Sequence, residues 1–477
     1  MFIFCEISYE KCKLAIKVSV DEILSHLILI NFKYNVKKVS GKKAIQMKIS
    51  IIGTGYVGLS TGIGLASLGN DIVCVDIDEE KINSLNKGII SIYEPGLKEQ
   101  LPKLLSSKNI SFSTDYSQIR DSEFVFVAVG TPTDISTGLP NLKFLDSAIN
   151  YLENFVKKGS VIILKSTVPP KTNKDLSEKL SKKGLFVISN PEFLKEGSAL
   201  SDFLTPDRII IGSDGSKEVI NKVMVLYDYF IKKGVQIIFT DFQSAEMIKY
   251  ASNAMLALRI SFINEISQLC DKFKANIKDV AKGIGSDKRI GTSFLNAGLG
   301  FGGSCFPKDV LALHSLGVQQ GLNMQITKSI LEVNSCQLRY FAQKIIDYFD
   351  KLDIEKPCLS VLGLAFKPQT DDIRESKAIE LITILKDKGF NIKAYDPKAI
   401  KNTIEEKGAD FVQFCDFSDV FEGCDGIILA TEWAEFVNLD FSLISQKLRH
   451  KVLFDGRNVF SKAKLEKLGF EYIGIGI

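Results

Sequence analysis

The sequence is poor in the residues that build metal sites and disulfide frameworks. Its 477 residues include three histidines and nine cysteines, and no two cysteines stand in a C-x-x-C pair. This spacing fits neither a zinc cluster nor a disulfide scaffold. We therefore expect no metal site, and a reducing cytoplasm is the expected compartment.

Charge of one sign and long apolar runs are also scarce. The net charge is +3, which gives no reason to expect a nucleic acid or a membrane surface as a partner. The best candidate for a membrane span, residues 23–32, is short and is interrupted by Ser25, His26 and Asn31.

The first 46 residues carry no motif and lack the small-residue exit of a signal peptide. Met47 stands directly before a strand-like run, Lys48 to Ile52. We expect this N-terminal extension, residues 1–46, to lie outside the fold and its deletion to leave an active protein.

From Lys48 onward, strand-like runs alternate with helical stretches, which predicts a parallel sheet covered on both faces. The runs lie at residues 48–52, 71–76, 124–130, 161–166, 186–190 and 208–212. The alternation returns after Lys356, with Gly-x-Ala in place of Gly-x-Gly and a strand that ends in Asp396. This second part reads as a degenerate copy of the first.

Between these parts, residues 244–273 contain no glycine or proline and repeat apolar residues at helical spacing, which predicts one long helix. The expected fold class is α/β, with two Rossmann-like doubly wound domains joined by a long central helix. The expected divisions are 1–46 (extension), 47–240 (first Rossmann-like domain), 241–350 (helical, dimer-forming region with a cysteine loop) and 351–477 (C-terminal α/β domain).

The motif "GTGYVG" places Gly53, Gly55 and Gly58 between a strand and a helix, with Tyr56 and Val57 among them. The next strand ends in Asp76, as the dinucleotide-binding fingerprint requires. The glycines let a pyrophosphate approach the helix N-terminus, and a carboxylate on the ribose favours NAD over NADP. Lys81 lies near the same ribose or is an ordinary solvated lysine. The alternative for the whole motif is a glycine turn without a ligand.

Three polar groups follow other strands. Thr131, in "VGTPT", is placed to meet the cofactor or a bound water, or it belongs to an ordinary turn. Glu192 and Glu196, in "NPEFLKEG", share a face if that segment is helical, although acids at a solvated helix start explain them equally well.

Two further polar residues, Lys249 and Asn253, share one face of the long central helix. Since that helix is otherwise apolar, they need partners, either in a polar pocket or in a structural network.

The segment "GFGGSCFPKD" places Cys305 in a bare loop, followed by Lys308 and Asp309. Cations and backbone N–H groups lower the pKa of a thiol, so this cysteine is a candidate nucleophile. We expect the glycines at 300, 302 and 303 to clear the approach to the sulfur. The alternative is a structural cysteine in a tight turn.

A nucleophilic cysteine beside an NAD site suggests a specific chemistry. An alcohol that loses a hydride becomes an aldehyde, the thiol captures it as a thiohemiacetal, and a second hydride transfer gives a thioester. Water then releases a carboxylic acid, so one site oxidises an alcohol by four electrons.

From Met47 onward the chain resembles the UDP-glucose 6-dehydrogenases, of the UDP-glucose/GDP-mannose dehydrogenase superfamily. The resemblance rests on the segments "GTGYVG", "SIYEPGL", "GTPT", "STVPP", "NPEFLKEG", "FLNAGLGFGGSCFPKD", "GLAFKPQTDDIRES", "YDP", "TEW" and "DGRN". It implies oxidation of UDP-glucose to UDP-glucuronate, with two NAD and one water, for nucleotide-sugar and polysaccharide biosynthesis.

The resemblance also implies roles for single residues. It makes Cys305 the nucleophile and Asp309 an acid/base or water-activating group. It places Lys249 and Asn253 near the reacting carbon, where Lys249 stabilises oxyanion charge. It implies that Thr131 and Glu196 hold water and cofactor. The remaining implied residues are Arg374 for the cofactor, and Glu192, Phe193, Leu194, Phe294, Leu295, Phe301, Gly302, Lys367 and Arg457 for the sugar nucleotide. Arg289 resembles a position that reaches a neighbouring subunit's site, which implies a homodimer or higher homo-oligomer.

Three rival functions remain. GDP-mannose dehydrogenases carry a similar cysteine loop, whereas dehydrogenases of UDP-N-acetylhexosamines usually have a histidine where this chain has Ser304. A non-catalytic nucleotide-binding protein would share the fold without needing Cys305, Lys249 and Asp309. A two-electron hydroxyacid dehydrogenase would not need the cysteine loop.

Overall fold

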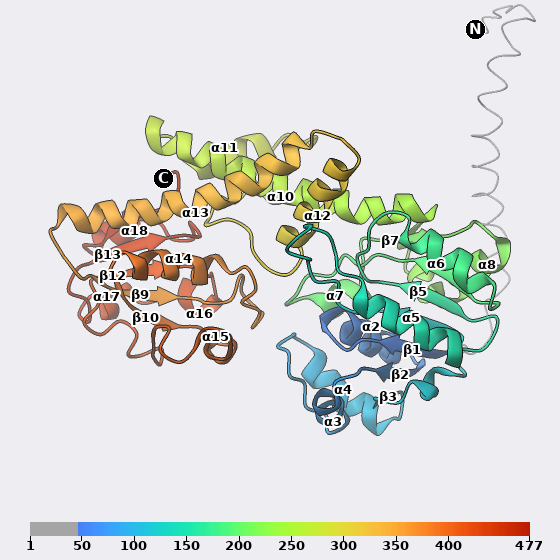
Figure 1. Cartoon of the computed structure of the whole chain (residues 1–477). Helices are drawn as coiled ribbons and strands as arrows, with labels where there is room; N and C mark the ends of the chain where they lie inside the picture. The colour runs from blue at the N-terminus through green and yellow to red at the C-terminus, as the bar shows by residue number, and fades with distance from the viewer. Residues whose placement is uncertain (1–45) are drawn as a thin grey trace, which may run out of the picture. The chain divides into compact units, whose positions relative to one another are not determined.

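The computed structural model describes residues 46–477, of which Met47–Ile477 form one compact unit. Our expectations for the N-terminal extension therefore lie outside the described residues. Two sheets and the helices around them make up this unit (Figure 1). Among the described residues, no helix is both long and apolar enough to cross a membrane.

The first sheet has eight strands in the order β3-β2-β1-β4-β5-β6-β7-β8. They are β1 (Lys48–Ile52), β2 (Asp71–Val75), β3 (Ile110–Ser113), β4 (Phe124–Val127), β5 (Val161–Leu164), β6 (Phe186–Ser189), β7 (Arg208–Gly212) and β8 (Gln236–Thr240). All neighbours are parallel except β6 and β7, which meet antiparallel at Ser189 and Gly212. The predicted parallel sheet is thus observed except at this one junction, because β7 and β8 run together in the reverse direction.

Helices cover both faces of the first sheet (Figure 1). They are α2 (Tyr56–Ser67), α3 (Glu79–Asn86), α4 (Leu97–Ser106), α5 (Lys143–Phe155), α6 (Thr172–Ser181), α7 (Ala199–Leu204), α8 (Lys217–Leu226) and α9 (Asp228–Lys232). Successive strand side chains point to opposite faces, so Ile51 and Ile52 enter two different apolar clusters. Burial on both faces explains why the strands read as continuous apolar runs.

The second sheet has six parallel strands in the order β11-β10-β9-β12-β13-β14. They are β9 (Cys358–Leu362), β10 (Asn391–Tyr395), β11 (Gln413–Phe414), β12 (Gly426–Leu429), β13 (Val452–Asp455) and β14 (Glu471–Ile473). Its helices are α14 (Lys377–Asp387), α15 (Ile400–Lys407), α16 (Ala434–Val437), α17 (Phe441–Ile444) and α18 (Lys462–Lys467).

Four helices form the middle of the chain: α10 (Phe242–Phe273), α11 (Ile277–Gly285), α12 (Phe306–Gln319) and α13 (Gln325–Lys351). The long helix α10 begins two residues before the predicted start, where the Asp241 carboxylate accepts from the Ser244 N–H and caps it. The predicted fold class is confirmed. The division at residues 240 and 350 stays a prediction, since residues 47–477 form one unit.

Candidate active site

The glycine turn between β1 and α2 has the shape that a dinucleotide needs. Gly53 has φ +93°, which favours glycine, and a Cβ there would lie 2.7 Å from the Ala128 carbonyl oxygen. A Cβ on Gly58 would collide with the Gly53 carbonyl. A Cβ on Gly55, the N-cap residue of α2, would instead meet no protein atom within 4 Å. Two glycines therefore serve chain packing, and the third leaves open space at a helix N-terminus that fits a pyrophosphate.

Asp76 lies directly after β2 and reaches back to this turn. Its Oδ2 accepts from the Thr54 N–H at 2.7 Å and from the Thr54 hydroxyl at 2.6 Å, and Lys81 Nζ lies 3.6 Å away. Burial opposes the charge of Asp76, but these groups outweigh it and hold the pKa of the carboxyl below its usual value. An ionised carboxylate at the rim of the turn fits a ribose and repels a 2′-phosphate.

Cys305 is half-buried at the N-terminus of α12, and the charge of Lys249, on α10, acts on its thiol. Asp309, one turn further along α12, is 1% exposed. Its Oδ2 accepts from Asn253 Nδ2 at 2.6 Å, and its Oδ1 lies 2.6 Å from Lys308 Nζ. Asn253 and Asp309, which the sequence assigned to one site, are therefore hydrogen-bonded to each other.

Lys249 forms a buried ion pair that the sequence did not reveal. Its Nζ donates to Glu192 Oε1 at 2.9 Å, and the two side chains are 4% and 8% exposed. Burial opposes the charge on Lys249, but Glu192, Cys305 and Asp309 raise the pKa of the ammonium above its usual value. Lys249 is therefore a cation at neutral pH, able to stabilise negative charge but not to accept a proton.

The thiol of Cys305 differs from the sequence expectation in its ionisation. Burial raises its pKa, the charges of Glu192 and Asp309 add to the effect, and Lys249 and the Ser304 hydroxyl oppose it. These groups therefore favour the thiol over the thiolate. Ionisation needs either a change in these charges or a proton acceptor at the moment of reaction.

The glycines of the cysteine loop also have a different role from the expected one. A Cβ on Gly302 would collide with the backbone carbonyl oxygen of Glu375, and a Cβ on Gly303 would lie 2.6 Å from the Phe366 ring. The Gly303 N–H donates to the Arg374 carbonyl at 3.0 Å. These glycines let the cysteine loop touch the segment 363–376 of the second sheet.

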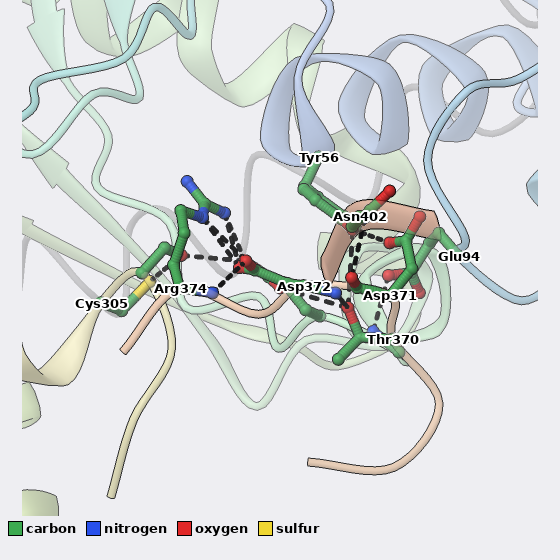
Figure 2. Close-up of polar contacts among 11 residues, drawn as sticks. Tyr56, Glu94, Cys305, Thr370, Asp371, Asp372, Arg374 and Asn402 are labelled. Carbon is green, nitrogen blue, oxygen red and sulfur yellow. Dashed lines mark hydrogen bonds and ion pairs between the residues drawn. The ribbon is translucent and has the colours of Figure 1, made fainter. Parts of the chain in front are cut away.

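That segment also binds the stretch that carries Glu196. The Glu196 carboxylate accepts from the Ser304 hydroxyl at 2.8 Å and lies 3.4 Å from Arg374 Nη2. Arg374 in turn forms a forked pair with Asp372, whose Oδ2 is 2.6 Å from Arg374 Nη2 (Figure 2). Burial raises the pKa of Glu196 to about 7, Asp372 adds to the effect, and Arg374 opposes it.

A second contact joins the glycine turn to the same segment. The Tyr56 hydroxyl, on the first residue of α2, donates to Asp371 Oδ1 at 2.5 Å (Figure 2). The Tyr93 N–H reaches Asp371 Oδ2 at 3.3 Å, and Asn402 donates to the Asp371 carbonyl at 2.8 Å. Tyr56, which the sequence placed at the cofactor, thus also links the two sheets, while the half-buried Val57 follows it in α2.

A cavity of about 780 Å³ lies between the loop before Cys305 and the second sheet. Phe294, Leu295 and Arg457 line it together, as expected of residues that bind one ligand, and Lys278 and Lys282 add positive charge. Arg457 forms a forked pair with Glu432 at 2.6 and 2.8 Å. The volume, the aromatic ring and the cations suit a nucleoside diphosphate.

Other expected site residues lie in varied places. Thr131 is buried and donates to the Thr167 carbonyl at 3.0 Å, next to the strand ends of the first sheet. The Phe301 ring packs in the apolar cluster of α10, α12 and α13.

Two expected cations lie in different surroundings. Lys367 is near Glu196, Glu94 and Cys305, and burial lowers the pKa of its ammonium. Arg289 is 88% exposed and pairs with Asp287 in its own loop.

The Glu192 segment lines a smaller cavity of about 130 Å³. There the Arg208 guanidinium lies over the Phe193 ring, with its Cζ 4.0 Å from the ring centre. The Leu194 N–H donates to Glu192 Oε2 at 2.6 Å. Lys165 lines the same cavity and was not identified from the sequence, although a lysine that ends a strand of four apolar residues was a visible signal.

Together, these groups form a buried cluster around one thiol. It contains the Lys249 cation, which is paired with Glu192, and the Asp309 carboxylate, which Asn253 and Lys308 hold. It also contains the Glu196 carboxyl, whose pKa is about 7. Such a set can stabilise an oxyanion on a carbon that the thiol attacks, and can move protons to and from water. Among the described residues, no group of His, Cys, Asp and Glu is arranged to hold a metal ion.

Comparison with known proteins agrees with this site. Three domains of the UDP-glucose/GDP-mannose dehydrogenase family match: the NAD binding domain at residues 47–231, the central domain at 243–336 and the UDP binding domain at 360–462. UDP-glucose 6-dehydrogenase of Rickettsia felis is 41% identical over 438 residues, which is 90% of this chain and 96% of that protein.

Solved structures show the same similarity. A UDP-glucose dehydrogenase of Pyrobaculum islandicum is 34% identical, with a TM-score of 0.82 over 92% of this chain and 99% of that one. The UDP-N-acetyl-mannosamine dehydrogenase Cap5O of Staphylococcus aureus is 29% identical, with a TM-score of 0.74 over 90% and 98%. The cysteine loop, the dinucleotide turn and these matches lead to one conclusion: the chain belongs to the UDP-glucose/GDP-mannose dehydrogenase family.

Proposed function

We propose that this protein oxidises UDP-glucose to UDP-glucuronate, using two NAD and one water for each sugar. The observation that carries the proposal is the cluster at Cys305, where a half-buried thiol meets the charges of Lys249, Glu192 and Asp309. A two-electron oxidation of an alcohol does not need such a thiol, whereas a four-electron oxidation can use it to hold the aldehyde.

The residues of the chain divide the chemistry as follows. NAD is held by the turn that Gly53, Gly55 and Gly58 form and by Asp76. When bound, NAD supplies the hydride acceptor for both oxidations. Cys305 Sγ adds to the aldehyde carbon to form a thiohemiacetal, and the thiol proton leaves to a neighbouring base or water.

The other groups of the cluster stabilise charge and activate water. The Lys249 cation stabilises the oxygen that becomes negative in this addition. After the second oxidation gives a thioester, water activated at Asp309 attacks its carbonyl carbon. The carbon–sulfur bond then breaks, which releases the acid and returns Cys305 as a thiol. Asn253 holds Asp309 through the 2.6 Å hydrogen bond, and we assign Thr131 and Glu196 to holding water and cofactor.

The sugar nucleotide occupies the cavity near Phe294. Lys278, Lys282 and Arg457 line it and supply the cations that a diphosphate needs. The proposed sugar-nucleotide site also includes Glu192, Phe193, Leu194, Leu295, Phe301, Gly302 and Lys367.

The second candidate substrate is GDP-mannose, whose dehydrogenases carry a similar cysteine loop. Acetamido sugars are disfavoured because Ser304, rather than histidine, precedes Cys305, and here its hydroxyl donates to Glu196. The test is product analysis with NAD and, in turn, UDP-glucose, GDP-mannose and UDP-N-acetylmannosamine. Acid product from UDP-glucose at least ten times faster than from the others is expected, and a preference for GDP-mannose would overturn the assignment.

We also propose that the protein acts as a homodimer or higher homo-oligomer in the cytoplasm, where its thiols stay reduced. One face of α10 exposes large apolar side chains: Met255 (58%), Phe262 (48%), Leu269 (51%) and Phe273 (80%). Their spacing of seven or four residues forms a stripe that a second copy can cover. Sedimentation of the wild type and of Phe262→Glu tests this, since a monomeric wild type would contradict it.

A further inference from the structure

Lys165 is a buried lysine that none of the steps above uses. It follows β5 directly, is 7% exposed, and its Nζ donates to Asn190 Oδ1 at 3.1 Å. Asn190 Oδ1 also accepts from the Tyr227 hydroxyl at 2.7 Å, and Asn190 Nδ2 donates to the Ile210 carbonyl at 2.8 Å. The Asn190 side chain is therefore fixed from three sides, and Lys165 is one of them.

Asn190 begins the segment that carries Glu192, the partner of Lys249. Lys165 acts on Glu192 by charge as well as through Asn190. Burial opposes the charge of the Glu192 carboxylate, but Lys249 and Lys165 both act to lower its pKa, and the result lies below the usual value. Glu192 is thus a buried carboxylate that two buried lysines, Lys165 and Lys249, stabilise.

Several other charged groups face Lys165 and Glu192 from the surrounding elements. Lys165 and Glu192 both line the cavity of about 130 Å³. The titratable groups around it are Asp202 on α7, Asp207 and Arg208 at the start of β7, Lys195 in the Glu192 segment and Tyr227 between α8 and α9. Asp202 and Lys195 pair with each other at 3.3 Å. Among these groups, Lys165 is the buried cation.

We propose that Lys165 is a positioning residue for the reaction at Cys305. It fixes the Asn190 side chain and, together with Lys249, the ion-pair partner of Glu192, it balances the negative charge of the Glu192 carboxylate. The inference rests on the proposed function, in which Cys305 is the nucleophile. It assigns a role to a residue outside the thiol, the acid/base group and the oxyanion stabiliser.

The charge balance makes the thiol sensitive to the protonation of Lys165. Burial lowers the pKa of the Lys165 ammonium to about 8, with Lys249 adding to the effect and Glu192 opposing it. The negative charge of Glu192 raises the pKa of the Cys305 thiol. When Lys165 loses its proton, that negative charge is less balanced, and Cys305 becomes harder to ionise.

The test compares Lys165→Met, Lys165→Arg and the wild type by the rate at which iodoacetamide alkylates Cys305 between pH 6 and pH 10. The tryptic peptide Ile290–Lys308 contains Cys305 as its single cysteine, so mass spectrometry follows this thiol alone. Lys232→Met is the matched control, because Lys232 is a surface lysine on α9, 61% exposed. Folding is checked by circular dichroism.

Below pH 8, where Lys165 is charged in the wild type, Lys165→Met is expected to slow alkylation of Cys305 about tenfold, because the loss of one nearby buried charge disfavours the thiolate. Above pH 8 the two profiles should converge. Lys165→Arg should keep the wild-type rate below pH 8 and exceed it above pH 8, because its charge persists there, and Lys232→Met should follow the wild type throughout. A Lys165→Met profile that matches the wild type would overturn the proposal, even if turnover were reduced. If Lys165→Met does not fold, Lys165→Arg decides: the wild-type inflection near pH 8 should vanish, and its persistence would overturn the proposal.

Alkylation uses no sugar nucleotide, so it separates this inference from the proposed function. If UDP-glucose is not oxidised, the alkylation result still reports on Lys165. If UDP-glucose is oxidised and the profile does not move, only the role of Lys165 fails.

Discussion

Replacing Gly302 by alanine tests the contact between the cysteine loop and the second sheet. The new Cβ would collide with the backbone carbonyl oxygen of Glu375, and a backbone group cannot rotate away as a side-chain tip can. Carbon and oxygen normally keep about 3.3 Å apart, so one of the two segments must move by about 1 Å. A displacement of that size next to reacting groups costs about 100-fold in rate, or about 2.7 kcal/mol of transition-state stabilisation.

The assay is steady-state NADH formation with UDP-glucose, together with urea unfolding. We expect kcat/KM to fall about 100-fold, and overpacking to lower the free energy of unfolding by about 1–3 kcal/mol. Gly283→Ala is the control, since an added Cβ in that helix meets nothing within 4 Å. A Gly302→Ala enzyme with kcat/KM within threefold of the wild type would show that the glycine is not needed for this contact.

Three further predictions use other parts of the site. Gly55→Ala should leave the unfolding midpoint unchanged but raise the KM for NAD about tenfold or more, because its Cβ meets ligand space rather than protein; an unchanged KM would place the pyrophosphate elsewhere. Asp76→Ala should weaken NAD use and narrow its preference over NADP, and equal use of both by the wild type would contradict the role of Asp76. Glu196, with its pKa raised to about 7 from 4.5, favours its neutral form in the folded protein. Its contribution to stability is therefore present below pH 4.5 and lost as the pH rises through 7. Glu196→Gln should flatten the pH dependence of the unfolding free energy in that window, and an unchanged slope would contradict the raised pKa.

Much of the fold could be predicted from the sequence, because local patterns determine it. Each of three signals lies within one segment: the apolar run Lys48–Ile52, the glycine turn, and the stretch of α10 without glycine or proline. The antiparallel meeting of β6 and β7 could not be predicted, since the direction of a strand depends on how its connection crosses the sheet. The strand pattern is the same in either direction.

The site was predictable as a set of residues but not as a set of pairs. Lys249 and Glu192 are separated by 57 positions, and no spacing rule connects them. The glycines before Cys305 suggested an open approach, whereas two of them serve contacts with Glu375 and Phe366. A glycine looks the same in a sequence whether a ligand or another segment of the chain fills the space that a Cβ would occupy.

The most direct test of the central claim counts NADH formed per UDP-glucose when the sugar nucleotide is limiting, for the wild type and for Cys305→Ala. The wild type is expected to give two NADH and one UDP-glucuronate per UDP-glucose. Cys305→Ala should bind both ligands yet lose formation of the acid by several orders of magnitude, as removal of a covalent nucleophile does. One NADH per sugar from the wild type, or two NADH and the acid from Cys305→Ala at a near wild-type rate, would contradict the proposed chemistry.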